Sequence, residues 1–205
     1  MVSSEPRSEG GRAPLVLASS SPRRLALLRQ VGIEPDLVEP PEVDETPSPR
    51  ELPRAYARRL ARAKALAVRE RLAGRPAWIL AADTVVACGR RILPKALDRE
   101  TAAACLDLLS GRRHRVLGGV CVLAPDGRSG ERLVTTIVKM KRLSAEERAR
   151  YLDSEEWHGK AGGYAIQGRA ALFVPAINGS YANVVGLPVC EAVALLQGLG
   201  WRWPR

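Results

Sequence analysis

The sequence predicts an α/β fold built on a mixed β-sheet, and three features indicate it. Residues 14–18, PLVLA, are typical of a short strand, and a tight turn then leads into a helix that begins at Pro22. Runs typical of buried strands alternate with segments of helical periodicity along the rest of the chain. Two apolar runs within residues 114–141 flank an Asp126-Gly127 turn and predict a long antiparallel hairpin, so the sheet is not purely parallel.

Each remaining element is predicted from its own pattern. Ser21 is expected to cap the first helix, and Gly32 to end it. Apolar residues recur at helical spacing from Pro49 to Leu72, with Lys64 at the edge of the apolar stripe. The apolar run at 78–88 is of the kind that a strand buried on both faces shows. A turn after this run, at Gly89, leads the chain back. The further elements expected are helices over 98–109, started by Asp98, over 145–152, with capping-box spacing at Ser144 and Glu147, and over 188–196, and strands over 164–167 and 172–175.

Length and composition favour a globular chain. With 205 residues, 46% hydrophobic and 26% charged, the chain can bury the core of one large domain or two small lobes. Residues 1–14 are expected to form a flexible tail and residues 15–205 a single domain, with no membrane-spanning segment. The four cysteines lie far apart in apolar stretches, which predicts buried free thiols in a reducing cytoplasm: Cys88, Cys105, Cys121 and Cys190.

A net charge of +10 would suit a polyanion, but the composition argues against nucleic acid as a partner. Only 4% of residues are aromatic, so few side chains can stack on unpaired bases. A solvated, arginine-rich surface explains most of the charge. Against 27 arginines there are five lysines, which mark places where a compact point charge is wanted if they fall within motifs: Lys64, Lys95, Lys139, Lys141 and Lys160.

Arg23 and Arg24 occupy the first turn of a helix, where partial positive charge makes arginines unfavourable unless an anion is present. A serine-rich turn that opens a helix exposes backbone N–H groups able to cradle phosphate, and arginines add charge-assisted bonds. The alternative is that both are ordinary surface arginines.

Asp83 lies inside an apolar strand, where a carboxylate must be paired, hydrogen-bonded or bound to a cation. Together with Glu45, from an irregular acidic stretch, it could supply oxygen ligands to a divalent cation such as magnesium. A structural aspartate and a solvated loop glutamate are the alternatives.

Three further residues have side chains suited to a ligand but give weak signals singly. Lys95 follows a proline in an expected turn, and Lys160 opens the glycine-rich segment KAGGYAIQG. Gln167, in the same segment, can donate and accept hydrogen bonds at once, as recognition of a base edge requires, although a buried glutamine bonded to backbone is the alternative. His114 and His158 fit no metal-binding or catalytic pattern.

The sequence motifs taken together are more specific than any single motif. LASSSPRR, VDE, RLARAKA, AADTVV, LSGRRHRV, KAGGYAIQG and INGSYANVVGLPVCE follow one another in an order that closely resembles the Maf family of nucleoside triphosphate pyrophosphatases, from about Leu15 to Leu196. The resemblance implies two lobes around a central cleft, as in a Maf or ITPase-like fold, and a homodimer. It also implies metal-dependent hydrolysis of a nucleotide to its monophosphate and pyrophosphate, with Asp83 as the catalytic residue.

These implied roles can be assigned residue by residue. Asp83 is expected to orient a water held by the cation toward the α-phosphorus, and with Glu45 it would anchor Mg²⁺ or Mn²⁺. The chain resembles the branch associated with dTTP and UTP, in which Arg23, Thr84 and Gln167 mark specificity. The family commonly has Lys-Pro where this chain has Lys95-Ala96, a departure expected to loosen the turn that aims Lys95 and to lower the rate. Ser19 or Ser21, together with Arg23 and Arg24, would hold the triphosphate at the helix N-terminus. Lys64, Lys95 and Lys160 would line the cleft as point charges, Lys64 and Lys95 as catalytic residues and Lys160 as a substrate-binding residue.

Two alternative functions stay open at this point. One is a house-cleaning pyrophosphatase that removes modified nucleotides. The other is a non-catalytic regulator of septum formation and cell division that binds nucleotide or nucleic acid, for which steeply salt-dependent retention on DNA would be the sign.

Overall fold

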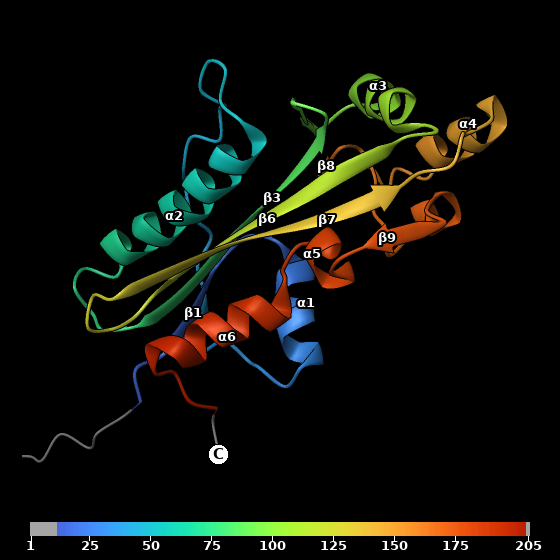
Figure 1. Ribbon diagram of the computed structural model, residues 1–205. Coiled ribbons are helices and arrows are strands. Elements are labelled where there is room, and N and C mark those ends of the chain that lie inside the picture. Colours follow the sequence, from blue (N-terminus) through green and yellow to red (C-terminus); the bar gives the residue numbers. More distant parts are fainter. Residues whose placement is uncertain (1–11, 204–205) are drawn as a thin grey trace, which may run out of the picture.

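The computed structural model describes residues 12–203 and shows an α/β fold around one long mixed sheet (Figure 1). The expected flexible tail, residues 1–14, falls mostly outside the described residues, although Arg12 is described and pairs with Asp36 at 3.1 Å. The predicted α/β class with a mixed sheet is confirmed. No helix of the described residues combines the length and apolar character that crossing a bilayer requires.

The sheet has the strand order β2-β1-β3-β6-β7-β9, with β4 paired to β3. β1 is parallel to β2 and β3, whereas β6 is antiparallel to both β3 and β7. The three long strands run side by side through the whole molecule (Figure 1). The strand bounds are β1 Leu15–Ala18, β2 Leu37–Val38, β3 Trp78–Cys88, β4 Arg91–Leu93, β6 Arg113–Leu123, β7 Ser129–Lys139 and β9 Ala176–Asn178, and a separate two-stranded sheet joins β5 Lys95–Ala96 to β8 Lys160–Ala161.

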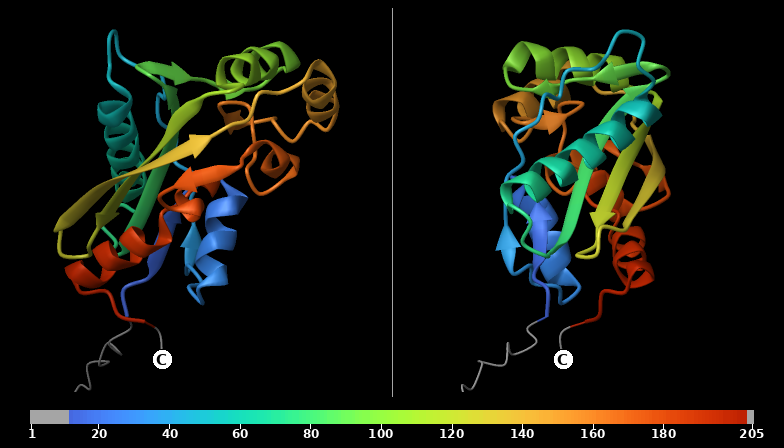
Figure 2. Two further views of the ribbon diagram at one scale, coloured as in Figure 1. Left: turned by 45° about the vertical axis from the view of Figure 1, so that its right-hand side comes forward. Right: turned by 90° about the vertical axis from the view of Figure 1, so that its left-hand side faces the viewer.

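Helices cover the two ends of the sheet differently, which gives the molecule two lobes (Figures 1 and 2). α2 packs on one face of the first lobe, and α1 and α6 lie on the other face, while α3 and α4 belong to the second lobe. The helices are α1 Pro22–Gln30, α2 Pro53–Arg71, α3 Arg99–Leu109, α4 Ala145–Asp153, the 3₁₀ helix η1 Arg169–Phe173, α5 Tyr181–Val185 and α6 Val189–Leu199.

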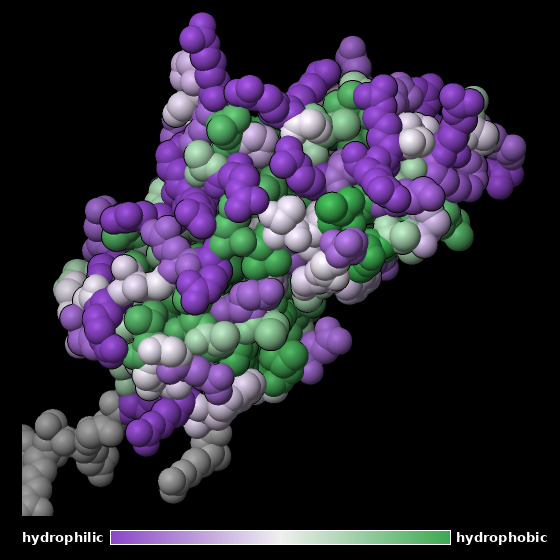
Figure 3. All heavy atoms as spheres, viewed as in Figure 1, coloured by the Kyte–Doolittle hydropathy of each residue, from purple (hydrophilic) through white to green (hydrophobic). Residues whose placement is uncertain are grey.

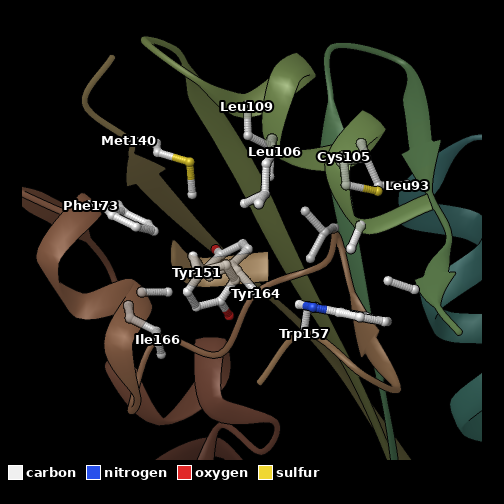
Figure 4. Close-up of a cluster of buried hydrophobic side chains, with 14 of the residues drawn as sticks. Leu93, Cys105, Leu106, Leu109, Met140, Tyr151, Trp157, Tyr164, Ile166 and Phe173 are labelled. Carbon is white, nitrogen blue, oxygen red and sulfur yellow. The ribbon is translucent and has the colours of Figure 1, made fainter. Parts of the chain in front are cut away.

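Each lobe has its own apolar core, while the sheet continues through both. In the second lobe, Leu106 and Leu109 of α3 pack with Met140, Tyr151 and other buried side chains (Figure 4). In the first lobe, the two faces of β1 and β3 contact α2 and the α1–α6 pair respectively. Hydrophilic residues cover much of the face shown in Figure 3, with smaller hydrophobic patches between them. The expected two lobes are therefore present, joined by a common sheet.

Most helix starts agree with their predicted capping signals. Asp98 accepts from the backbone N–H of Thr101 at 2.6 Å, and Ser144 and Glu147 form the expected capping box. Ser21 does occupy the N-cap position, but its side chain makes no capping hydrogen bond, so that part of the prediction is wrong.

The long second helix begins at Pro53 rather than Pro49. A residue that precedes a proline is driven out of the helical region, and Leu52 is extended, with ψ 143°. Residues 49–50 form a turn instead.

Two predicted strands are wrong. Residues 164–167 form an irregular segment and a turn, because Tyr164 and Ile166 are buried in the second core without pairing to a strand of the described chain. Residues 172–173 end the 3₁₀ helix and residues 174–175 are irregular. The strand begins only after Pro175, which has no N–H to donate to a ladder. The thiols are free as expected, but Cys190 is exposed on α6, so burial of all four is also wrong.

Candidate active site

A gap along one edge of β3 locates the candidate site. β1 pairs with β3 only as far as Ala18 opposite Ala81, and β4 begins its pairing at Val86. Between these points, Asp83 and Thr84 have no strand partner on that edge within the described residues. The carboxyl end of a parallel strand is a common ligand site. Here a cleft of about 380 Å³ opens at the end of β1.

The structure brings every predicted site residue to this cleft. Five basic side chains and two carboxylates line it, beside serine, threonine and glutamine side chains. Two of the five lysines, Lys139 and Lys141, do not line it. The predicted residues that do are Ser19, Ser21, Arg23, Arg24, Glu45, Lys64, Asp83, Thr84, Lys95, Lys160 and Gln167.

On the α2 side of the sheet, Lys64 joins the two carboxylates. Its Nζ lies 2.6 Å from Asp83 Oδ1 and 2.7 Å from Glu45 Oε1, and only 6% of its side chain is exposed. Lys95 donates to the other oxygen of Glu45. Burial raises the pKa of Glu45, but hydrogen bonds and charge from the two lysines outweigh burial and lower that pKa to about 2. Both carboxylates therefore form ion pairs with lysine ammonium groups.

A glycine in the neighbouring strand lets α2 come close enough for this contact. Gly119 lies opposite Asp83 in the β3–β6 ladder, and a Cβ there would sit 2.1 Å from the backbone oxygen of Ala57. Because that position has no side chain, the helix can rest on the sheet and Lys64 can reach Asp83.

On the other face, Arg24 binds neutral groups. Its Nε donates to the backbone oxygen of Gly186 at 2.8 Å, and its terminal nitrogens donate to Ser19 Oγ at 3.1 Å and Thr84 Oγ1 at 3.3 Å. Arg24 is buried, and burial lowers its pKa while the charge of Asp83 partly offsets this. No carboxylate of the described residues forms an ion pair with it.

Arg23 is half-buried and donates from Nε to the backbone oxygen of Val185 at 3.3 Å. Burial lowers its pKa as well. The two arginines thus join the start of α1 to the end of α5, and neither forms an ion pair with an acidic side chain of the described residues.

The far wall of the cleft comes from the glycine-rich segment. β5 and β8 pair so that Ala96 lies opposite Lys160, which brings Lys95 and Lys160 to one small sheet. Gly162 has φ +71°, and a Cβ there would lie 2.8 Å from Val86, so the turn requires glycine. Gln167 follows on the rim and is exposed, which rules out the buried glutamine considered from the sequence.

Three local expectations are corrected here. Lys95-Ala96 forms a strand rather than a turn, and Ala96 is fully buried in the second core. Lys64 is buried, not at the edge of the apolar stripe of α2. The Ser21 side chain, expected to cap α1, forms no hydrogen bond with residues 12–203, whereas Ser19 Oγ accepts from Ser21 N at 3.1 Å and from Arg24.

Sequence reasoning missed two residues that hold the site together. Tyr56 donates its hydroxyl to the backbone oxygen of Glu45, and burial raises the pKa of this tyrosine to about 12, so it stays a donor. The signal was its spacing, since Tyr56, Leu60 and Lys64 recur every four residues on one helix face. Gly186, whose carbonyl accepts from both Arg24 and Thr84, gives no sequence signal for that role.

The donor set was tested for a divalent cation. Residues 12–203 contain no group of three or more His, Cys, Asp or Glu side chains that could hold a metal ion. Glu45 and Asp83 nevertheless converge on one point, the position of Lys64 Nζ. Magnesium is commonly held by one or two carboxylates, with substrate phosphates and water completing its shell. The two acids therefore fit a cation whose other ligands arrive with a phosphorylated substrate.

The chain is similar to known proteins along nearly its whole length. The family model described as Maf-like protein matches residues 14–199. A protein of Paramagnetospirillum magneticum named dTTP/UTP pyrophosphatase is 65% identical over 189 residues, which cover 92% of this chain and 98% of the relative. A protein of Rhodospirillum rubrum with the same name is 61% identical, over 97% of this chain and 92% of that relative.

A solved structure from Mycobacterium abscessus, titled nucleoside-triphosphatase / dITP/XTP pyrophosphatase, is 21% identical and has a TM-score of 0.41, over 64% of this chain and 74% of that one. The family match and the closely similar relatives settle the class. The chain belongs to the Maf family.

Proposed function

We propose that this chain hydrolyses nucleoside triphosphates, dTTP and UTP above all, to the nucleoside monophosphate and pyrophosphate. The observation that carries the proposal is the cleft itself, in which five cationic side chains surround Glu45 and Asp83 at the end of β1. Relatives that share more than half of its residues bear the name dTTP/UTP pyrophosphatase. A highly charged anion that arrives with a divalent cation suits this cleft, because the anion can pair with the basic side chains and the cation with the two carboxylates.

Each side of the cleft has its own part in the proposed reaction. Arg23, Arg24 and Lys160 bind and orient the phosphates through charge-assisted hydrogen bonds. Mg²⁺ or Mn²⁺ held by Glu45 and Asp83 supplies positive charge that offsets the charge developing on the leaving pyrophosphate.

The chemical step is an attack of water on the α-phosphorus. A new oxygen–phosphorus bond forms, and the bond from the α-phosphorus to the oxygen that bridges to the β-phosphorus breaks. The bonding electron pair leaves with the pyrophosphate, and the proton lost by the attacking water passes to solvent. Asp83 Oδ2 accepts no hydrogen bond from the described residues, and we assign it to hold the attacking water in line. Before substrate binds, Lys64 and Lys95 hold the two carboxylates in place through ion pairs.

Base selection is assigned to the rim. The exposed amide of Gln167 can donate to O4 and accept from N3–H, the edge that thymine and uracil share. Thr84 and Arg23, anchored to Gly186 and Val185 respectively, border the same space.

The remaining assignments concern the protein as a whole. We propose a single domain over residues 15–205, which the sheet common to both lobes supports. Four free cysteines support a cytoplasmic location. A homodimer is proposed from the family resemblance.

The test is pyrophosphate release from ordinary, methylated and deaminated nucleoside triphosphates, with Mg²⁺, Mn²⁺ or no metal, by wild type and Asp83→Asn. We expect release concentrated on dTTP and UTP, dependent on metal and lowered about a thousandfold in the variant, which is nearly isosteric. Lys141→Met, at a position that does not line the cleft, serves as the control. Full turnover by folded Asp83→Asn would remove the assigned role, release concentrated on modified nucleotides would favour the house-cleaning alternative, and no release by folded wild type would remove the enzyme.

A further inference from the structure

The position between the two proposed metal ligands already holds a cation of the protein's own. Lys64 Nζ lies within 2.7 Å of both Glu45 and Asp83 and is buried, with 6% of its side chain exposed. Lys95 also contacts Glu45, but 49% of its side chain is exposed. The free-energy cost of leaving the carboxylate therefore differs between the two lysines. The exposed ammonium of Lys95 can move into solvent, whereas the buried ammonium of Lys64 cannot.

A divalent cation that binds both carboxylates must take over the place of the Lys64 ammonium. A buried ammonium that loses its acceptors is strongly unfavourable. The side chain needs new oxygen acceptors, and the phosphates of a nucleotide in the same cleft supply them. Binding of the cation and binding of the nucleotide therefore each raise the affinity for the other, which is a positive coupling between two ligands.

We propose, building on the function above, that Lys64 is an internal counter-ion that keeps free divalent cations out of the site until a nucleotide arrives. In the empty protein Lys64 holds the two carboxylates together at the spacing that the cation needs. When the nucleotide binds, Lys64 turns to its phosphates and gives up the carboxylates. The metal is then admitted as the metal–nucleotide pair.

The test measures Mn²⁺ binding directly, by calorimetry and by the paramagnetic resonance signal of free Mn²⁺. Wild type is titrated alone and with a dTTP analogue whose α,β-bridging oxygen is replaced by nitrogen, so that it resists cleavage there. A protein-free titration corrects for Mn²⁺ held by the analogue. We expect the analogue to tighten Mn²⁺ binding to the protein by about tenfold or more, within the usual range of coupling between two ligands.

Variants then identify the residue. Without nucleotide, Lys64→Met is expected to bind Mn²⁺ about tenfold more tightly than wild type, because no ammonium competes for the carboxylates, and Lys95→Met to show a smaller gain. Lys141→Met removes a lysine from another carboxylate, that of Glu147, outside the cleft, and is expected to bind Mn²⁺ as wild type does. Lys64→Met/Asp83→Asn, which lacks a ligand, should lose the gain.

Several outcomes would overturn the proposal. These are wild type binding Mn²⁺ as tightly alone as with the analogue, or folded Lys64→Met binding it no more tightly than wild type. If Lys64→Met fails to fold, the wild-type comparison decides. If either contrary result is found and the protein still hydrolyses dTTP and UTP, the proposed role of Lys64 is wrong and the proposed function stands. A folded wild type that neither binds the analogue nor releases pyrophosphate would instead remove the proposed function.

Discussion

The two groups of cations in the cleft are held in opposite ways. Arg23 and Arg24 donate to backbone oxygens and hydroxyl groups and form no ion pair with the described residues. Lys64 and Lys95 contact carboxylates. The groups lie on either side of adjacent residues of β3, since Thr84 meets Arg24 and Asp83 meets Lys64.

This difference shows where the substrate's charge is needed. The arginine side keeps positive charge that is not ion-paired in a partly buried place, and an arriving phosphate can pair with it. The lysine side is neutralised in advance, and its carboxylates become available only when the lysines release them. Arginine suits the first task because its planar fork can bind protein and phosphate at once, while lysine suits the second because a compact charge is easily exchanged.

The largest expected contrast is in stability. Lys64→Met leaves Asp83 as a buried, unpaired carboxylate and should lower the free energy of unfolding, without metal, by about 3–5 kcal/mol. Arg24→Met removes a buried cation that has no acidic partner, so the lost hydrogen bonds are partly offset and the change should stay within about 1 kcal/mol. Urea unfolding of both variants in EDTA measures this. Equal losses for the two would contradict the distinction between the groups.

The next effect is on substrate binding. Arg24→Met should raise the KM for dTTP by about tenfold to a hundredfold, which corresponds to losing a charge-assisted hydrogen bond of about 1.5–3 kcal/mol. Arg23→Met, at a half-buried position, should have the smaller effect of the two. Steady-state kinetics at saturating Mg²⁺ provides the measurement, and Arg128→Met, which lies on the distant hairpin turn, is the matched control. An unchanged KM with lowered kcat would mean that Arg24 acts on the chemical step instead.

The elements that the sequence predicted correctly are those with local signals. Hydrophobic periodicity and capping residues located α1, α3, α4 and the β6–β7 hairpin, because each signal acts within a few residues of the element. The segments at 164–167 and 172–175 were mistaken for strands because apolar residues were read as sheet, while tertiary burial in the second lobe holds them in irregular structure. Burial alone does not specify a strand.

The candidate site shows the same limit at a finer scale. Residue types pointed to the acids, arginines and lysines that line the cleft, since a carboxylate in an apolar strand or arginines at a helix start conflict with local preference. Partners distant in sequence could not be predicted: Gly186 lies 162 residues from Arg24, and Lys95 lies 50 residues from Glu45. Such pairs depend on the fold and carry no pattern of their own.

The smallest expected effect is a difference in acid sensitivity between the two groups. The pKa of Glu45 is about 2 in the folded protein against an ordinary value of 4.5, so its contribution to stability is present above pH 4.5 and is lost as the pH falls toward 2. Glu45→Gln cannot titrate there. The stability advantage of wild type over Glu45→Gln, about 1 kcal/mol or less for a carboxylate that is one-third exposed, should therefore shrink over that range.

The arginine side sets the reference for this measurement, because no carboxylate contacts Arg24. Metal-free thermal unfolding at several pH values measures this. The gap in Tm between wild type and Glu45→Gln should close in acid, while the gap in Tm between wild type and Arg24→Met should stay constant. If acid closes both gaps alike, the arginines depend on the same carboxylates as the lysines, and the two groups form one network. If it closes neither, the lysines do not hold the charge of Glu45 in the folded protein.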